Sequence, residues 1–390
     1  IKVSMKFLPK NSNFFFLLKY LPKKLEFILQ IQLFQFPRIW WSDEVPSSIL
    51  SINKRRWNLD DEKGYEIDFE AVVRKFVPKH IPSCYLEGYE SLKSLSDKLG
   101  WPSNPKAIFT ANADIWDDIF KLYTAEKVET GSSLFIGQHG GHFGVNTFSF
   151  IEEHQIKISD KWFSWGWSDR LRPNITPVGN LKIEMSSLKY NSRGGALMVT
   201  AAYPRYSYYL YAVPIAGQYL KYFEVQKSFI NNLPCHIKKQ ITLRLYPIDY
   251  GWDQVARFRS SFKDLKISNS DENMSNLVKQ SRIYISTYNA TTYLESLASN
   301  VPTVIFWDKD QYEINEEALP YFMLLKEVGI FHETPESASL HVANIWDNIS
   351  AWWDTELVQS ARINFCERYS YSSDLVPQNL KKAMNSASQI

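Results

Sequence analysis

The stretch SRIYISTYNATTYLESLASNVPTVIFWD, Ser281–Asp308, decides the fold that we predict for this chain. Its first strand, 282–286, is β-branched and aromatic, which favours a buried position. Apolar residues then recur at helical spacing over 293–298. Asn300 and the proline after it end that helix, and 301–307 forms a second apolar strand. Strand, helix and strand in this order predict a parallel βαβ unit.

The start of this helix is rich in side-chain oxygens. Asn289, Thr291 and Thr292 supply them at the carboxyl end of the first strand, where helix-capping residues are expected. Free N–H groups and the helix dipole make such a place favourable for phosphate. Glu295 lies one turn further on, where a carboxylate can accept hydrogen bonds from ribose hydroxyls. We therefore predict a nucleotide site at this helix start.

Length and composition favour a two-domain α/β protein. The chain has 390 residues, of which 45% are hydrophobic, and a net charge of +2. That length allows two cores, and that charge gives no general bias toward nucleic acid. Cys84, Cys235 and Cys366 have neither zinc-ligand nor disulfide-framework spacing, which is typical of a reducing cytoplasm. A signal peptide is not recognisable. We expect a cytoplasmic protein.

The N-terminal segment is basic and partly amphipathic. Six lysines precede the first acidic residue, Glu26, and lie among apolar runs at 14–18 and 25–36. Neither run reaches the roughly 20 apolar residues of a membrane span. One interpretation is a solvated charged face beside core residues. The other is peripheral contact with the anionic inner membrane.

Strands alternate with helices along most of the chain. A second βα unit is expected at 106–137, and the polar stretch 183–195 indicates a domain boundary. Residues 1–100 show no clean pattern. We predict two Rossmann-like, doubly wound domains, an N-terminal acceptor-side domain at 1–185 and a C-terminal nucleotide-sugar domain at 186–370, with a tail at 371–390.

The motif FIGQHGGHFG, 135–144, combines a strand end with a glycine-rich loop. Gln138 and His139 lie at the carboxyl end of the strand, where open α/β sheets bind ligands. Gly140 and Gly141 allow backbone to approach a ligand closely, and His139 can serve as acid or base. The alternative is a tight structural turn. Asp114 either caps the following helix or acts as a catalytic carboxylate with His139.

Two further motifs carry charge. Arg244 lies in a strand of LRLYPIDYGWDQ, 243–254, and either reaches a ligand phosphate or makes a structural ion pair. Tyr246 follows it and is placed to stack on a base. The triplet 308–310, Asp-Lys-Asp, is a weak signal for a divalent metal.

Taken together, five motifs resemble one family, the LIC-type transferases of bacterial surface-polysaccharide (O-antigen, lipopolysaccharide and capsule) gene clusters. They are FIGQHGGHFG, SWGWSD at 164–169, PVGNLK at 177–182, LRLYPIDYGWDQ and TTYLESLASNVPTVIFWD at 291–308. The resemblance covers about 109–369. Relative to that family, the first domain is expected to be shortened at its N-terminus. The last motif is also similar to the donor-site βαβ unit of GT-B glycosyltransferases, including bacterial Kdo transferases.

This resemblance implies a GT-B fold with two domains facing a cleft and metal-independent catalysis without a resident cofactor. It implies that Asn289, Thr291 and Thr292 hold the donor phosphate and that Glu295 holds ribose. The function that we expect is transfer of a sugar from a CMP- or UDP-linked donor to a glycan or lipid-linked glycan acceptor. A sugar-nucleotide epimerase on the same fold, and a glycan-binding or assembly subunit without catalysis, remain alternatives.

Overall fold

A computed structural model describes residues 13–44, 59, 69–182, 189–206, 212–269 and 271–387. The chain divides into two compact units. Unit 1 contains Ile1–Lys19, Lys24–Gly137 and Met384–Ile390, and unit 2 contains Tyr20–Lys23 and Gln138–Ala383. The domain boundary that we predict at 185/186 lies outside the described residues.

Unit 1 contains a parallel ladder of three strands in the order β1-β2-β3. The strands are β1 (Phe14–Leu17), β2 (Ala107–Thr110) and β3 (Ser133–Gly137). The helices are α1 (Lys23–Gln32), α2 (Phe69–His80), the 3-10 turn η4 (Ser83–Tyr85), α3 (Tyr89–Lys98), α4 (Ala113–Trp116) and α5 (Asp118–Glu129). Phe15 is fully buried and its ring contacts Trp40, Trp101 and Tyr123. Aromatic packing therefore forms much of this core.

Unit 2 contains a six-stranded parallel sheet in the order β11-β10-β9-β6-β7-β8. Its strands are β6 (Gly195–Val199), β7 (Ile241–Arg244), β8 (Lys266–Ile267), β9 (Ser281–Ser286), β10 (Thr303–Phe306) and β11 (Phe331–His332). A second parallel pair joins β4 (Lys161–Ser164) to β5 (Ile175–Pro177). The order changes direction around β6 and β9, which is typical of doubly wound α/β sheets.

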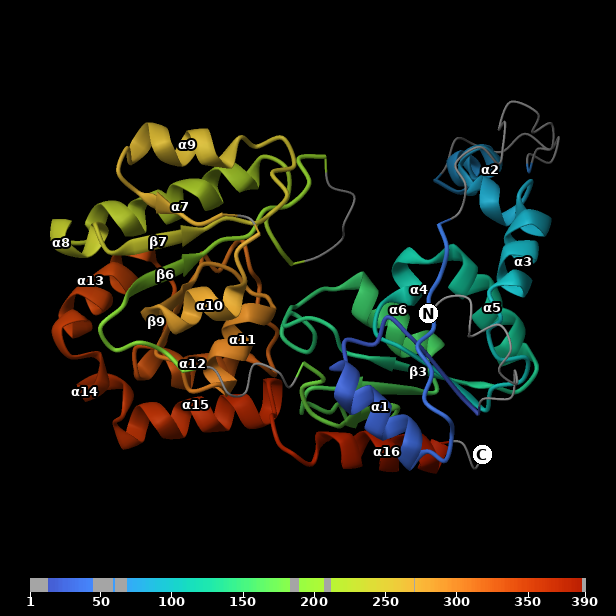
Figure 1. Cartoon of the computed structure of the whole chain (residues 1–390). Helices are drawn as coiled ribbons and strands as arrows, with labels where there is room; N and C mark the ends of the chain where they lie inside the picture. The colour runs from blue at the N-terminus through green and yellow to red at the C-terminus, as the bar shows by residue number, and fades with distance from the viewer. Residues whose placement is uncertain are drawn as a thin grey trace. The chain divides into compact units, whose positions relative to one another are not determined.

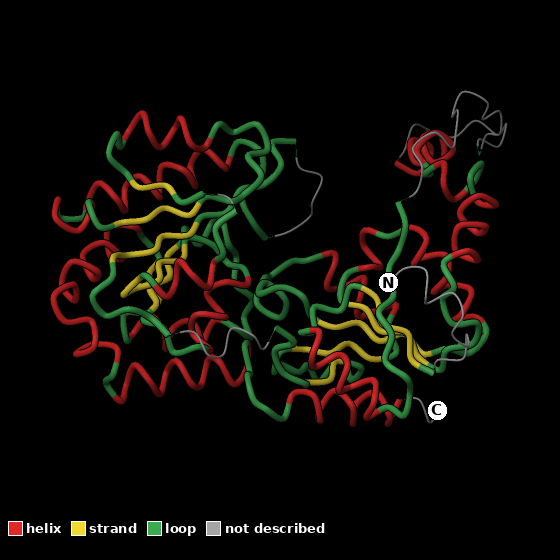
Figure 2. The backbone as a smooth tube through the Cα atoms, viewed as in Figure 1, coloured by secondary structure: helices red, strands yellow, loops and turns green. Residues whose placement is uncertain are grey.

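Helices cover both faces of the six-stranded sheet (Figure 1 and Figure 2). On one side α7 packs against α13, and on the other α15 packs against α11 and α12. The described helices of unit 2 are α6 (Phe150–Ile158), α7 (Gln218–Asn232), α8 (Cys235–Lys238), α9 (Gln254–Ser261), α10 (Met274–Lys279), α11 (Thr291–Ala298), α12 (Leu319–Glu327), α13 (Pro335–Ile345), the 3-10 turn η6 (Trp346–Asn348), α14 (Ile349–Trp353) and α15 (Glu356–Tyr369). The last helix, α16 (Val376–Ala387), begins in unit 2, and its residues from Met384 belong to unit 1.

The predicted fold class is confirmed, because parallel strands alternate with helices throughout. The predicted βα unit at 106–137 is wrong in one detail, since its helical part is not a single helix. It is broken at Asp117, whose side chain accepts a hydrogen bond from the Phe120 amide and begins a new helix, α5. The described residues of 13–98, where the sequence has no clean pattern, form β1 and the helices α1, α2 and α3. In the described part of the chain, every helix is too short or too polar to span a membrane.

Candidate functional site

The βαβ unit of 281–308 forms as predicted, with α11 between β9 and β10. The start of α11 differs from our prediction. Ala290 is the N-cap residue, with extended backbone and no side-chain capping bond, and Thr291 and Thr292 are already helical. The first N–H groups of this helix are therefore not satisfied by a side-chain cap.

The glycine loop of 138–144 lies against this helix start. A Cβ added to Gly141 would meet the Ala290 carbonyl oxygen at 2.2 Å, so only glycine allows this approach. The side-chain amide of Asn289 also donates to Asn146 at 2.8 Å. Two motifs about 150 residues apart, which sequence reasoning treated separately, therefore form one site.

Gln138 holds the loop in shape. It is fully buried, and its side-chain oxygen accepts hydrogen bonds from the Trp165 amide at 2.9 Å and the Trp167 indole at 3.0 Å. Its side-chain nitrogen donates to the carbonyl oxygen of Gly140 at 2.8 Å. These contacts explain why the SWGWSD motif accompanies the glycine loop. They are structural, and direct contact of Gln138 with a ligand stays a prediction.

The far end of the loop is held by an ion-pair network. The Gly144 amide donates to Glu152 at 2.7 Å, and Arg172 contacts Glu152 at 3.3 Å and Asp169 at 2.6 Å. A Cβ on Gly144 would lie 2.5 Å from the ring of Trp167. The loop is therefore fixed at both ends, as a preorganised site requires.

The two histidines of the loop differ in environment. His139 stacks on Tyr20, with ring centroids 6.1 Å apart, and makes an edge contact with Phe143 at 4.8 Å. Burial lowers the pKa of His142 to about 4, which keeps this ring neutral near pH 7. His142 is thus suited to packing, and His139 is the better candidate for chemistry.

At the α11 start Asn289 is buried, Thr291 and Thr292 are half-buried, and Asn289 and Thr292 make side-chain hydrogen bonds. Asn289 is 1% exposed and accepts a hydrogen bond from Tyr293 at 3.0 Å. The Thr292 hydroxyl contacts the hydroxyls of Tyr284 at 2.6 Å and Tyr288 at 2.9 Å. Tyrosine hydroxyls thus surround the place where the sequence predicts a phosphate.

Glu295 is 8% exposed and lies on the same helix. Its carboxylate is 4.0 Å from the ammonium of Lys182. Burial raises the pKa of this carboxyl, and Lys182 acts in the opposite direction. The role of this carboxylate as a ribose acceptor stays a prediction.

The remaining predicted residues are more scattered. Arg244 ends β7, is 8% exposed and donates to the backbone carbonyl of Asn269. Tyr246 is 39% exposed and stacks on Tyr250 at 5.9 Å, as a base-binding surface requires. Asp114 is buried in the first turn of α4, in unit 1. The ligand-binding roles of Arg244, Tyr246 and Asp114 stay predictions.

The Asp-Lys-Asp triplet contacts a lysine. Lys221 lies 2.6 Å from Asp308 and 3.9 Å from Asp310. Among the residues that the structure describes, no group of three or more His, Cys, Asp or Glu side chains is arranged to hold a metal ion.

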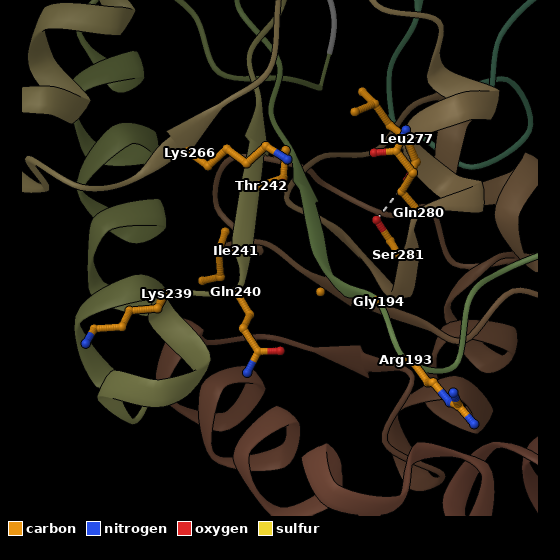
Figure 3. Close-up of a pocket in the computed structure, with 11 residues that line it drawn as sticks. Arg193, Gly194, Lys239, Gln240, Ile241, Thr242, Lys266, Leu277, Gln280 and Ser281 are labelled. Carbon is orange, nitrogen blue, oxygen red and sulfur yellow. Dashed lines mark hydrogen bonds between the residues drawn. The ribbon is translucent and has the colours of Figure 1, made fainter.

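A hollow of about 240 Å³ lies at the opposite, amino edge of the six-stranded sheet (Figure 3). Arg193, Lys239 and Lys266 are among its lining residues. The side chains of Arg193 and Lys239 extend away from one another rather than converging on its centre (Figure 3). Ligands of open α/β sheets bind at the carboxyl edge, so we place the candidate site at the α11 start instead.

Sequence reasoning missed three residues of the site. Asn146 lies two residues after Gly144, the end of the glycine loop, and that position was a usable signal. Lys182 ends the PVGNLK motif, which we quoted without assigning a role to its lysine. Tyr20 comes from a segment with no pattern, and only the tertiary structure places it on His139.

Parallel sheets that alternate with helices, with a strand order that changes direction in the sheet of unit 2, define a Rossmann-like α/β protein. The chain belongs to the LIC12162 family transferases, whose family model matches residues 1–384. The resemblance stated from the five motifs is thereby confirmed.

Solved structures with similar folds share little sequence with the chain. A protein from Listeria monocytogenes classed as a UDP-N-acetylglucosamine 2-epimerase has a TM-score of 0.52 and 9% identity, with 96% of this chain and 95% of that chain covered. The wall teichoic acid polymerase TagF has a TM-score of 0.44 and 11% identity, with 75% of each chain covered. MurG from Acinetobacter baumannii has a TM-score of 0.43 and 10% identity, with 82% of each chain covered. A comparison with curated proteins found no match.

Proposed function

We propose that this transferase is a glycosyltransferase that moves a sugar from a nucleotide-sugar to a bacterial surface-glycan acceptor. One observation carries the proposal. The loop of His139 lies directly on the uncapped start of α11, with Gly141 against Ala290. A leaving phosphate at the helix start would thus be close to the only ionisable loop side chain that we consider suited to chemistry.

The predicted site residues fall into two groups: those that bind the donor and those that act at the reacting carbon. The α11 start, with Asn289, Thr291 and Thr292, neutralises charge on the leaving phosphate, which is preorganised electrostatic stabilisation. Arg244 and Glu295 complete the donor site toward phosphate and ribose. Tyr246 stacks on the base.

The reacting carbon is served by His139 with Asp114, as base or transition-state stabiliser. Gln138, Gly140 and Gly141 shape the loop around it. In this proposal catalysis uses no metal, and the donor carries CMP or UDP.

Isothermal titration with CMP, UDP and GDP tests the proposal. We expect the folded chain to bind one of them, and His139→Ala to leave that affinity within about twofold while abolishing sugar transfer. Thr291→Ala with Thr292→Ala should weaken binding at least tenfold. A folded sample that binds none of the three nucleotides would refute the donor site.

An epimerase is the second candidate, and the fold likeness to a protein classed as a 2-epimerase motivates its test. Incubation of a nucleotide-sugar without any acceptor separates the two reactions. An epimerase converts the donor into its isomer, whereas a glycosyltransferase leaves it intact apart from slow hydrolysis. A glycan-binding subunit would do neither, and glycan assembly would survive His139→Ala with Glu295→Ala.

We also propose peripheral contact of the basic N-terminal segment with the inner membrane, from the cytoplasmic side. Phe27 and Ile31 of α1 are 56% and 52% exposed and follow Lys23 and Lys24. This combination suits an anionic lipid surface. In flotation with phosphatidylglycerol vesicles, we expect the native chain to float with the vesicles. The double variant Phe27→Ser with Ile31→Ser should stay behind. Equal recovery of both proteins with the vesicles would contradict the contact.

A further inference from the structure

The ion pair between Lys182 and Glu295 joins a motif without an assigned role to the predicted ribose carboxylate. The side chains are 27% and 10% exposed, and the charged atoms are 4.0 Å apart. Ion pairs at this degree of burial are screened far less by solvent than surface pairs. Loss of one partner leaves the other charge buried and uncompensated.

Hydrogen bonds fix the backbone of Lys182 relative to α11. The Lys182 amide donates to the Asn180 side-chain oxygen at 2.9 Å, and the Asn180 side-chain nitrogen donates to the Ser370 hydroxyl at 3.3 Å. That hydroxyl donates to the carbonyl oxygen of Leu294 at 3.2 Å, one residue before Glu295. The PVGNLK turn is therefore tied to the helix turn that carries the carboxylate.

The ammonium of Lys182 also faces the His139 side of the site. It lies 4.8 Å from the centre of the Tyr20 ring, which stacks on His139. A cation over an aromatic face is stabilised by the ring quadrupole. Lys182 is thus held between the Glu295 carboxylate and the aromatic neighbour of His139.

The other titratable groups around Glu295 do not replace this cation. Tyr284 and Tyr288 contact the same helix start, and burial raises the pKa of Tyr288 to about 12 and that of Tyr284 well above 10. Both phenols are neutral near pH 7. Arg362 of α15 donates to the Leu297 carbonyl, further along the helix. Among these groups, Lys182 is the cation that opposes the burial-driven rise in the pKa of Glu295.

We propose that Lys182 is a positioning residue that keeps the Glu295 carboxylate charged and aimed as a ribose acceptor, and so sets a preference for ribonucleotides over dideoxynucleotides. This inference rests on the proposed donor site. A carboxylate accepts hydrogen bonds from two ribose hydroxyls, whereas a protonated carboxyl loses part of that capacity. Arginine at position 182 retains the positive charge and can also face the Tyr20 ring. It should therefore substitute for lysine.

The test uses CMP, UDP or GDP, whichever the native chain binds, together with its 2′,3′-dideoxy counterpart. We expect at least tenfold preference for the ribonucleotide in the native chain. Lys182→Met should reduce that preference to about twofold or less, and Lys182→Arg should restore most of it. Lys157→Met is the matched control, because Lys157 and Glu153 are also 4.0 Å apart but exposed at 77% and 51%.

The pH profile separates positioning from general structural damage. Without Lys182 the pKa of Glu295 rises further, so ribonucleotide affinity should fall at a higher pH on acidification than in the native chain. Glu295→Gln should remove this pH dependence in both backgrounds. The inference would be overturned if Lys182→Met bound the nucleotide as tightly as the native chain, with the same ribonucleotide preference and the same pH profile. Absence of nucleotide binding by the native chain would instead refute the proposed function.

Discussion

Two helices that pack on the six-stranded sheet differ in how their N-termini are capped. At the start of α13, the Thr334 hydroxyl accepts a hydrogen bond from the Ser337 amide at 3.2 Å, and Pro335 occupies the first turn. At the start of α11, Ala290 provides no side-chain cap, although two threonines follow it. A threonine side chain caps the first turn of α13. No side chain caps the first turn of α11, so its N–H groups are not satisfied in that way.

The difference teaches that capping and ligand binding compete for the same backbone groups. A side-chain cap adds about 1 kcal/mol of stability. Giving up that stability at α11 is reasonable if an anion binds there, as helix N-termini commonly do. The glycine loop is packed on α11, where Gly141 touches Ala290.

The largest effect is expected from Gly141→Ala. Its Cβ would lie 2.2 Å from the Ala290 oxygen and 2.9 Å from a Leu294 methyl carbon, so the loop or the helix start must move. We expect a loss of about 3 kcal/mol in the free energy of unfolding and loss of nucleotide binding.

Gly217→Ala is the control for that variant. Gly217 has helical backbone angles and open space around its Cβ position. Chemical denaturation should find its stability within about 0.5 kcal/mol of the native value. Equal stability for the two variants would mean that the loop does not lie on α11 as described.

The next largest effect is expected from acid, which should lower the free energy of unfolding through His142 in the glycine loop. The pKa of His142 in the folded chain is about 4, below its ordinary value of 6.5. Between these values the unfolded state binds the proton and the folded state does not, so stability falls as pH decreases from 6.5. We expect a loss of about 1–2 kcal/mol by pH 5, and a flatter denaturation profile for His142→Gln. Identical pH profiles would exclude His142 as the cause.

Paired threonine variants compare the two helix starts directly. Thr334→Ala removes a cap and should lower the free energy of unfolding by about 1 kcal/mol. Thr291→Ala should change stability by less than about 0.5 kcal/mol and act on nucleotide affinity instead. Thermal unfolding and titration calorimetry give both quantities, and a reversed pattern would contradict the contrast between α11 and α13.

A small gain in stability is expected when α11 receives a side-chain cap. Ala290→Ser should raise the free energy of unfolding by about 0.5 kcal/mol. Ala290→Asp should give a similar gain, and its charge should weaken nucleotide binding at least tenfold by repelling phosphate. Unchanged affinity in the aspartate variant would place the phosphate elsewhere.

Much of unit 2 could be predicted because its elements carry local signals. Asn300 has a φ of +54°, as its predicted role in ending α11 requires. Thr334, directly before Pro335, caps α13. β1 was not recognised, since Phe14–Leu17 is uniformly aromatic or apolar and lacks alternation. It is buried on both faces as part of a parallel ladder, which removes that signal.

The sequence by itself determined the parallel α/β class, the βαβ unit of 281–308 and the list of candidate site residues, because periodicity, caps and helix stops act within a few residues. Only the tertiary structure decided which of them meet. It placed Gly141 on Ala290, Asn146 on Asn289 and Lys182 beside Glu295. These contacts join residues more than 100 positions apart, and they depend on how the loops pack at the sheet edge, which local propensity does not encode.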